Sequence, residues 1–217
     1  MADIFQEVDE EVRREQLKKL WDRYGHYVIV AAAIVVAAVA GWRGWEYWQN
    51  KRAGELGAQF DAALTLSEQG KHAEAEAAFS RVAADATAGY RVLARLQEAA
   101  QRAQSDRQAA VAAYDALAAD TSVPRPVREL ASIRAGLLLV DTASLAEMTQ
   151  RFEPLTAPDG PFRHSARELL ALSAYRVGDA AAAKRWFDAI TTDAEAPQGL
   201  RARIEVLRTL SGAGGKG

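Results

Sequence analysis

The longest apolar run of the chain lies near its N-terminus. Residues 28–40 consist only of Val, Ile and Ala, and no charged side chain occurs between Tyr27 and Trp42. At about 1.5 Å per residue, residues 25–48 extend about 36 Å as a helix, enough to cross a hydrocarbon core of roughly 30 Å. Arg43 and Glu46 lie near the end of this stretch, where long side chains reach the headgroups. The pattern predicts a single membrane-spanning helix over residues 25–48.

Aromatic residues flank this run on both sides, and four of the five tryptophans of the chain lie there. Indole and phenol rings prefer the membrane interface, where the ring is half buried and its polar atom stays hydrated. We expect an interfacial belt formed by Trp21, Tyr24, Tyr27, Trp42, Trp45 and Trp48. Two alternatives are open: a cleavable signal sequence, because 38–40 reads Ala-Val-Ala, and a buried helix of a soluble protein. We favour the uncleaved anchor.

The positive charges that flank the span predict its orientation. Five Lys and Arg residues lie shortly before the apolar run at 28–40, and three, namely Arg43, Lys51 and Arg52, lie shortly after it. This difference favours a cytoplasmic N-terminus and places the larger C-terminal domain outside, which is the periplasm if the membrane is the inner membrane of a Gram-negative bacterium. Apolar residues recur at three- and four-residue steps within residues 1–24, which predicts an amphipathic leader helix on the inner leaflet or on a partner; a solvated leader is the alternative.

After a short polar linker at residues 49–54, an Ala followed four residues later by an aromatic ring recurs about every 35 residues or a multiple of it. These pairs are Ala75 with Phe79, Ala110 with Tyr114 and Ala183 with Phe187, and Met148 with Phe152 fits a weaker unit between the last two. A small residue lets two helices approach closely, and the ring one turn later fills the space toward the next unit. The recurrence predicts repeated helix–turn–helix units.

The turns and unit boundaries carry a second signal. Gly70 and Gly178 precede two of the Ala–aromatic pairs at the spacing of a turn that ends one helix in the left-handed conformation. This resembles the tetratricopeptide repeat. We expect an all-α fold with about four helix pairs over residues 55–211, a C-terminal capping helix and a disordered tail at 212–217. Ser105 replaces the glycine in the second unit, which leaves the register of that unit open, and a generic helical bundle is the alternative.

Composition and charge narrow the possible chemistry. The chain has 27 basic and 29 acidic residues without a basic stripe, so nucleic acid is not an expected partner. It contains no Cys and three His, none at a recurring metal-ligand spacing, and the phosphate-binding and catalytic motifs are absent from it. We therefore expect no enzyme activity, no cofactor, no metal and no small-molecule substrate. The expected function is protein binding.

Stacked helix pairs form a concave groove lined by the first helix of each pair. Counted from the turns, the groove candidates are Phe60, Leu64, Ile133, Leu137, Leu172 and Tyr175. The alternative for each is a place in the core. The groove hypothesis predicts that Phe60→Asp and Tyr175→Asp weaken partner capture without unfolding the domain.

The order of elements extends the resemblance. An acidic and basic leader at residues 9–15, the segment Leu-Trp-Asp-Arg-Tyr-Gly at 20–25, one span and degenerate repeats together resemble the YfgM-type ancillary subunits of the Sec translocon, in their alphaproteobacterial form. The resemblance implies a periplasmic helper at the translocon, beside a membrane-anchored prolyl-isomerase-like chaperone, that engages newly translocated chains. It carries no catalytic residue. A scaffold for envelope or division assembly is the alternative function.

Overall fold

The computed structural model describes the backbone of residues 3–86 and 88–210, and the side chains of this part except for residues 3–13, 15, 16 and 88. In this part every regular element is a helix, which confirms the predicted all-α class. The chain divides into two compact units, residues 1–55 and 56–217. The predicted tail at 212–217 and the apolar side chains of the first part of the leader lie outside the described residues.

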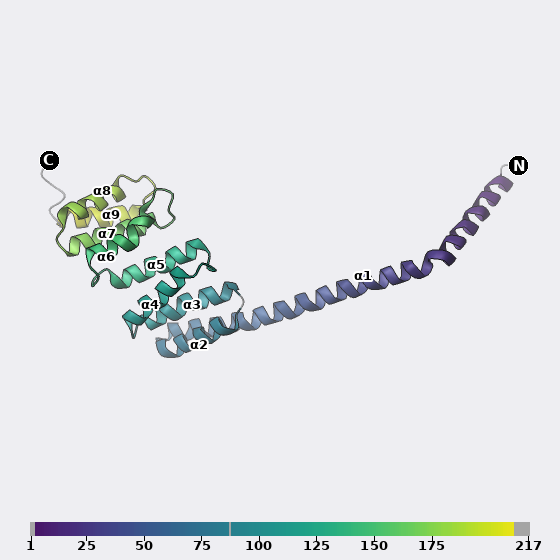
Figure 1. Cartoon of the computed structure of the whole chain (residues 1–217), viewed down its shortest axis with the longest axis horizontal. Helices are drawn as coiled ribbons and strands as arrows, with labels where there is room; N and C mark the ends of the chain where they lie inside the picture. Colours follow the sequence, from purple (N-terminus) through teal and green to yellow (C-terminus); the bar gives the residue numbers. More distant parts are fainter. Residues whose placement is uncertain (1–2, 87, 211–217) are drawn as a thin grey trace. The chain divides into compact units, whose positions relative to one another are not determined.

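Helix α1 (Asp3–Glu68) is continuous through the leader, the apolar run and the predicted linker (Figure 1). The predicted linker at residues 49–54 is thus helical, and the division between the two units follows it, between residues 55 and 56. Most residues of that segment are good helix formers, it contains no Pro, and the single Gly54 costs a helix only about 1 kcal/mol. Residues 56–68 of the same helix form the first element of the second unit.

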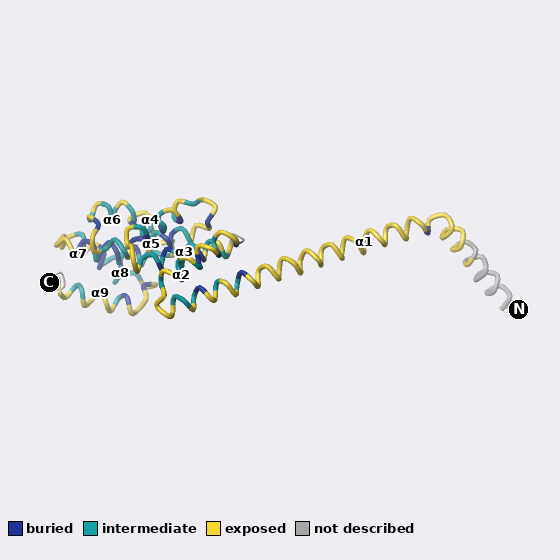
Figure 2. Tube along the Cα trace, turned by 90° about the horizontal axis from the view of Figure 1, so that it is seen from below, coloured by how far each residue is buried: buried dark blue, intermediate teal, exposed yellow. Residues whose placement is uncertain are grey.

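From Leu17 to Trp48 the large apolar side chains of α1 are exposed, as Figure 2 shows along this part of the helix. Helix α1 is long and apolar enough to cross a membrane, and only 6% of its most apolar window is buried. A buried core helix of a soluble protein would show the opposite, so that alternative is contradicted. Arg43 pairs with Glu46 at 3.4 Å along the helix, which offsets the charge of both near the end of the apolar run.

The second unit consists of helix pairs that follow one another along the chain (Figure 1). The end of α1 pairs with α2 (His72–Asp85), α3 (Ala88–Arg102) with α4 (Arg107–Ala119), α5 (Arg125–Leu139) with α6 (Leu145–Phe152), and α7 (Arg163–Arg176) with α8 (Ala180–Thr191). A 3-10 helix, η1 (Glu153–Thr156), joins the third pair to the fourth, and α9 (Gln198–Leu210) packs on α8. Four pairs and a closing helix confirm the predicted architecture.

The turns inside the pairs follow the residues predicted for them. Gly70 and Gly178 have φ angles of 73° and 76°, in the left-handed region that glycine adopts without steric cost. In the second pair the side chain of Asp106 instead accepts a hydrogen bond from the backbone N–H of Ala109 at 2.9 Å and caps α4. In this pair a side-chain N-cap therefore marks the start of the second helix, and no left-handed glycine precedes it.

The repeated pairs of small and large residues form the cores of the units. Ala75, Ala110 and Ala183 and the rings four residues after them are all buried. In the third pair, Gly136 of α5 takes the place of the small residue, because a Cβ atom there would lie 2.5 Å from Cζ of Phe152 and 2.7 Å from Cδ1 of Leu169. The close helix contact needs a position without a side chain.

Candidate protein-binding groove

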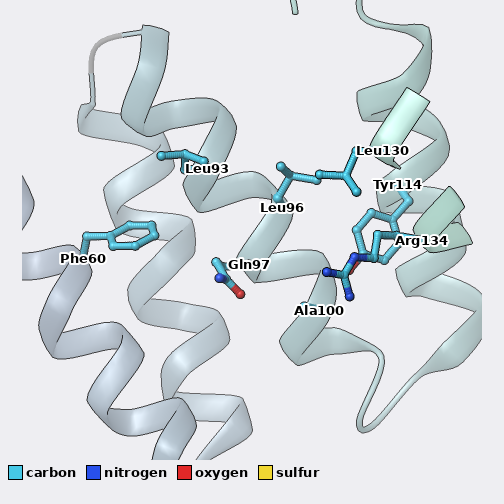
Figure 3. Close-up of a pocket in the computed structure, with 8 residues that line it drawn as sticks. All are labelled: Phe60, Leu93, Leu96, Gln97, Ala100, Tyr114, Leu130 and Arg134. Carbon is cyan, nitrogen blue, oxygen red and sulfur yellow. The ribbon is translucent and has the colours of Figure 1, made fainter. Parts of the chain in front are cut away.

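A cavity of about 250 Å³ opens between the first helices of the first three pairs, within the second unit. It is lined by Phe60 of α1, by Leu93, Leu96, Gln97 and Ala100 of α3, by Tyr114 of α4, and by Leu130 and Arg134 of α5 (Figure 3). The four residues of α3 follow the spacing of one helix face. We call this cavity the groove.

Phe60 forms one wall of the groove and is fixed by aromatic packing. Its ring contacts Phe79 edge-on with centroids 5.2 Å apart, and Tyr90 with centroids 6.0 Å apart. Such pairs add about 0.5–1.5 kcal/mol beyond the burial of area. Phe60 therefore belongs both to the core of the first pair and to the groove surface.

The central part of the groove is apolar. The side chain of Leu93 is 51% exposed, while Leu96 is half buried against the cluster that contains Tyr114. Leu130 lies across the groove on α5 (Figure 3). An exposed leucine on a helix whose other face is buried leaves apolar surface for a partner, and its burial in a complex would contribute about 1.5–3 kcal/mol.

Polar groups gather at the α5 side of the groove. Burial raises the pKa of the Tyr114 hydroxyl, and the nearby positive charge of Arg134 partly offsets this. The hydroxyl therefore stays neutral near pH 7, as an O–H donor. In Figure 3 the Gln97 side chain lies between Phe60 on one side and Tyr114 with Arg134 on the other. The groove thus combines an apolar surface with an amide, a hydroxyl and a guanidinium.

The residues predicted for the groove do not all lie there. Phe60 lines it. The surface prediction for Ile133 is wrong, because its side chain is only 6% exposed and belongs to the core that also contains Phe152 and Leu169. Leu64 is half buried against the core of the first pair. Leu137 is 53% exposed, but neither it nor Leu172 nor Tyr175 is among the residues that line this cavity.

The prediction missed the residues of α3, which contribute half of the lining. The register of the second unit was left open because Ser105 stands where the turn glycine belongs. A usable signal was present: Leu93, Leu96, Gln97 and Ala100 share one helix face, while Ala94 and Ala99 on another face are fully buried. Ala94 and Ala99 mark the packed side of this helix, and Leu93, Leu96 and Gln97 mark its groove side.

The six residues predicted for the membrane belt are exposed on α1. The rings of Trp45 and Trp48 lie 5.6 Å apart, and the guanidinium of Arg52 lies over Trp48 at 5.2 Å from the ring centroid. A cation over an indole at the end of an apolar run suits the headgroup region. The interfacial role of these residues stays a prediction.

The fold and the groove define the class of the protein: a membrane-anchored helical-repeat protein whose repeat domain is a protein-interaction module. Residues 18–206 match the family described as tetratricopeptide repeat-like domain, and the chain belongs to this family.

One curated relative extends the comparison. The chain is similar to the ancillary SecYEG translocon subunit of Haemophilus influenzae (strain ATCC 51907 / DSM 11121 / KW20 / Rd), with 32% identity over 92 residues, which are 42% of this chain and 45% of the relative. The match therefore spans less than half the length of that relative. It confirms the resemblance inferred from the leader, the span and the repeats. No solved structure matches the chain significantly.

Proposed function

We propose that the protein is an ancillary subunit of the Sec translocon whose groove binds segments of newly translocated polypeptides. The observation that carries the proposal is the apolar groove formed by α1, α3 and α5, in a chain that is similar to an ancillary SecYEG translocon subunit. A single-pass anchor would hold this groove close to the membrane from which newly translocated polypeptides emerge. The proposed partners are the translocon, its client chains and a membrane-anchored prolyl-isomerase-like chaperone.

The size of the groove suits brief binding of unfolded chains. A volume of about 250 Å³ accommodates one or two large side chains. Burying one such side chain contributes about 1.5–3 kcal/mol, far less than the roughly 8 kcal/mol of a micromolar complex. A helper that must release its client gains from contacts that are individually weak. The groove contains no group arranged to act on the client chemically, within the residues that line it.

The proposed orientation places the N-terminus in the cytoplasm and the repeat domain in the periplasm. It is supported by the excess of Lys and Arg before the span. The chain has no native cysteine, so single cysteines report the orientation directly. Lys18→Cys and Ser105→Cys both change exposed side chains. In cells whose outer membrane has been made permeable and whose inner membrane is intact, a membrane-impermeant maleimide should label the cysteine at position 105. It should leave the cysteine at position 18 unlabelled. The reverse pattern would contradict the orientation.

The binding function is tested by photocrosslinking in inner-membrane vesicles that carry stalled translocating chains. A photoreactive amino acid replaces Leu93 in one variant and Leu137 in a matched control. Both leucines are about half exposed and lie on first helices, but only Leu93 lines the groove. We expect adducts with the stalled chain from position 93 and few from position 137. Equal yields from both positions would exclude the groove as the binding site, and adducts only with envelope or division proteins would favour a scaffold.

A further inference from the structure

The arginines of the second unit differ in how their charges are neutralised. Within the described residues, several guanidinium groups form ion pairs across helices: Arg95 with Asp120 at 2.7 Å, Arg102 with Glu76 at 2.8 Å, and Arg151 with Asp115 at 2.8 Å. Arg134 is exposed, lines the groove and forms no ion pair or hydrogen bond with any residue of that part of the chain. Its charge is therefore available to a partner.

The polar groups beside Arg134 are also available. Neither the Gln97 amide nor the Tyr114 hydroxyl forms a hydrogen bond with a described residue, although Tyr114 is buried apart from its contact with the groove. The guanidinium offers five N–H donors, the amide two and the hydroxyl one, and no carboxylate lines the groove. A site this rich in donors is complementary to an anion with several lone pairs, of which a carboxylate is the one that polypeptides carry.

The rest of the lining determines what must accompany the carboxylate. Phe60, Leu93, Leu96 and Leu130 provide an apolar surface that continues directly into the polar end. A segment that fills the groove therefore presents apolar side chains beside its acidic one. The chain's own C-terminal residues 211–217 contain neither Asp nor Glu and do not meet this requirement. The complementary occupant is a segment of another polypeptide.

We infer that the groove selects polypeptide segments in which a Glu or Asp side chain is flanked by apolar residues, with Arg134 and Tyr114 binding the carboxylate. This inference rests on the proposed binding function and names the class of segment that the groove accepts. It separates two contributions: the apolar surface supplies affinity for any apolar segment, and Arg134 supplies the preference for acidic ones.

The test uses the full chain in detergent micelles and fluorescently labelled pools of short synthetic peptides with amidated C-termini. The pools share randomised flanks of apolar and small residues and differ only in the central residue, which is Glu, Gln or Lys. Binding is measured by fluorescence anisotropy. We expect the Glu pool to bind about fivefold more tightly than the Gln pool, the upper range for a partly exposed ion pair, and the Lys pool to bind least. The preference should shrink as salt is raised.

Two variants assign the preference to its residue. Arg134→Gln should make the Glu and Gln pools bind alike. Arg107→Gln removes another exposed arginine, which does not line the groove, and should keep the preference. A preference that survives Arg134→Gln, or equal binding of all pools to the unmodified chain, would overturn the inference.

The outcomes separate this inference from the function on which it rests. Leu93→Asp should weaken the binding of every pool, because it puts a charge on the apolar surface. If Leu93→Asp weakens binding but the pools are not distinguished, the groove binds polypeptides without the acidic preference. If none of the pools binds at all, both the inference and the groove as a polypeptide site are wrong.

Discussion

The two compact units of this protein use similar side chains in opposite ways. From residue 28 to residue 40 of the first unit, the Val, Ile and Ala side chains surround the helix on all sides and are exposed. Within residues 56–86 and 88–210, most large apolar side chains lie on one stripe of each helix and are buried or half buried against neighbouring helices, while a few such as Leu93 and Leu137 are exposed. Hydrophobic composition alone therefore does not separate an anchor from a core helix; the distribution of apolar residues around the helix does.

The difference reflects what replaces water around each helix. A helix without a polar face exposes apolar side chains to water in every orientation, so lipid must cover it. Its backbone N–H and C=O groups form hydrogen bonds within the helix and need no water. A helix with an apolar stripe buries that stripe against protein and keeps its other face hydrated. The same physical cause leaves the side of α3 that carries Leu93 open, because the second unit buries only the side with Ala94 and Ala99.

The largest expected effect concerns the anchor. Val30→Asp combined with Ile34→Asp puts two charges in the middle of the apolar run, each at a cost of about 2.5–3.5 kcal/mol for insertion. We expect this variant to leave the membrane fraction on alkaline carbonate extraction, whereas the unmodified chain stays, at full length. Leu137→Asp adds a charge to an exposed site of the second unit and should not release the chain. Retention of the double variant would show that another segment anchors the protein.

The next effect compares the same substitution in both units. Gly136→Ala should lower the free energy of unfolding of the second unit by about 1–3 kcal/mol, because the added Cβ would meet Phe152 at 2.5 Å. Gly41→Ala in α1 has no atom within 4 Å of the added Cβ and should leave this free energy unchanged. Thermal unfolding followed by circular dichroism in detergent measures both. Equal melting temperatures for the two variants would mean that the contact between α5 and α6 can relax at no cost.

The smallest effect concerns charge. Hydrogen bonds from Arg163, from the backbone N–H of Glu195 and from Arg167 hold the pKa of Asp193 well below that of an ordinary carboxyl group, and so link α7 to the segment after α8. A lowered folded-state pKa contributes stability above the unfolded value of about 4, and this contribution is lost as the pH falls below it.

We therefore expect the melting temperature of the second unit to fall as the pH is lowered below about 4, and to fall less in Asp193→Asn, which starts from a lower value at pH 7. Glu46→Gln is the matched control, because its exposed pair with Arg43 joins two residues of one helix and no other element. It should leave the pH dependence unchanged. If the melting temperature fell equally with pH in Asp193→Asn and in the unmodified chain, Asp193 would not be the cause of the acid sensitivity.

Most of the fold could be predicted from local pattern. The Ala–aromatic pairs and the two turn glycines specify where helices pack and where they end. For the groove, the sequence predicted that one would exist between first helices but not which residues line it. Ile133 and Leu137 are both apolar residues of α5, but one faces the core and the other does not. Their spacing on one helix contains no information about which neighbouring helix covers which side.

The sequence by itself determined that this chain has one apolar segment suited to lipid and a stack of paired helices, because these follow from periodicity, turn chemistry and residue type. The tertiary structure decided that α3 supplies half of the groove and that Arg134 is left without an acidic partner among the described residues. These outcomes depend on which side chains from distant parts of the chain come into contact. The packing of the helices against one another determines these contacts.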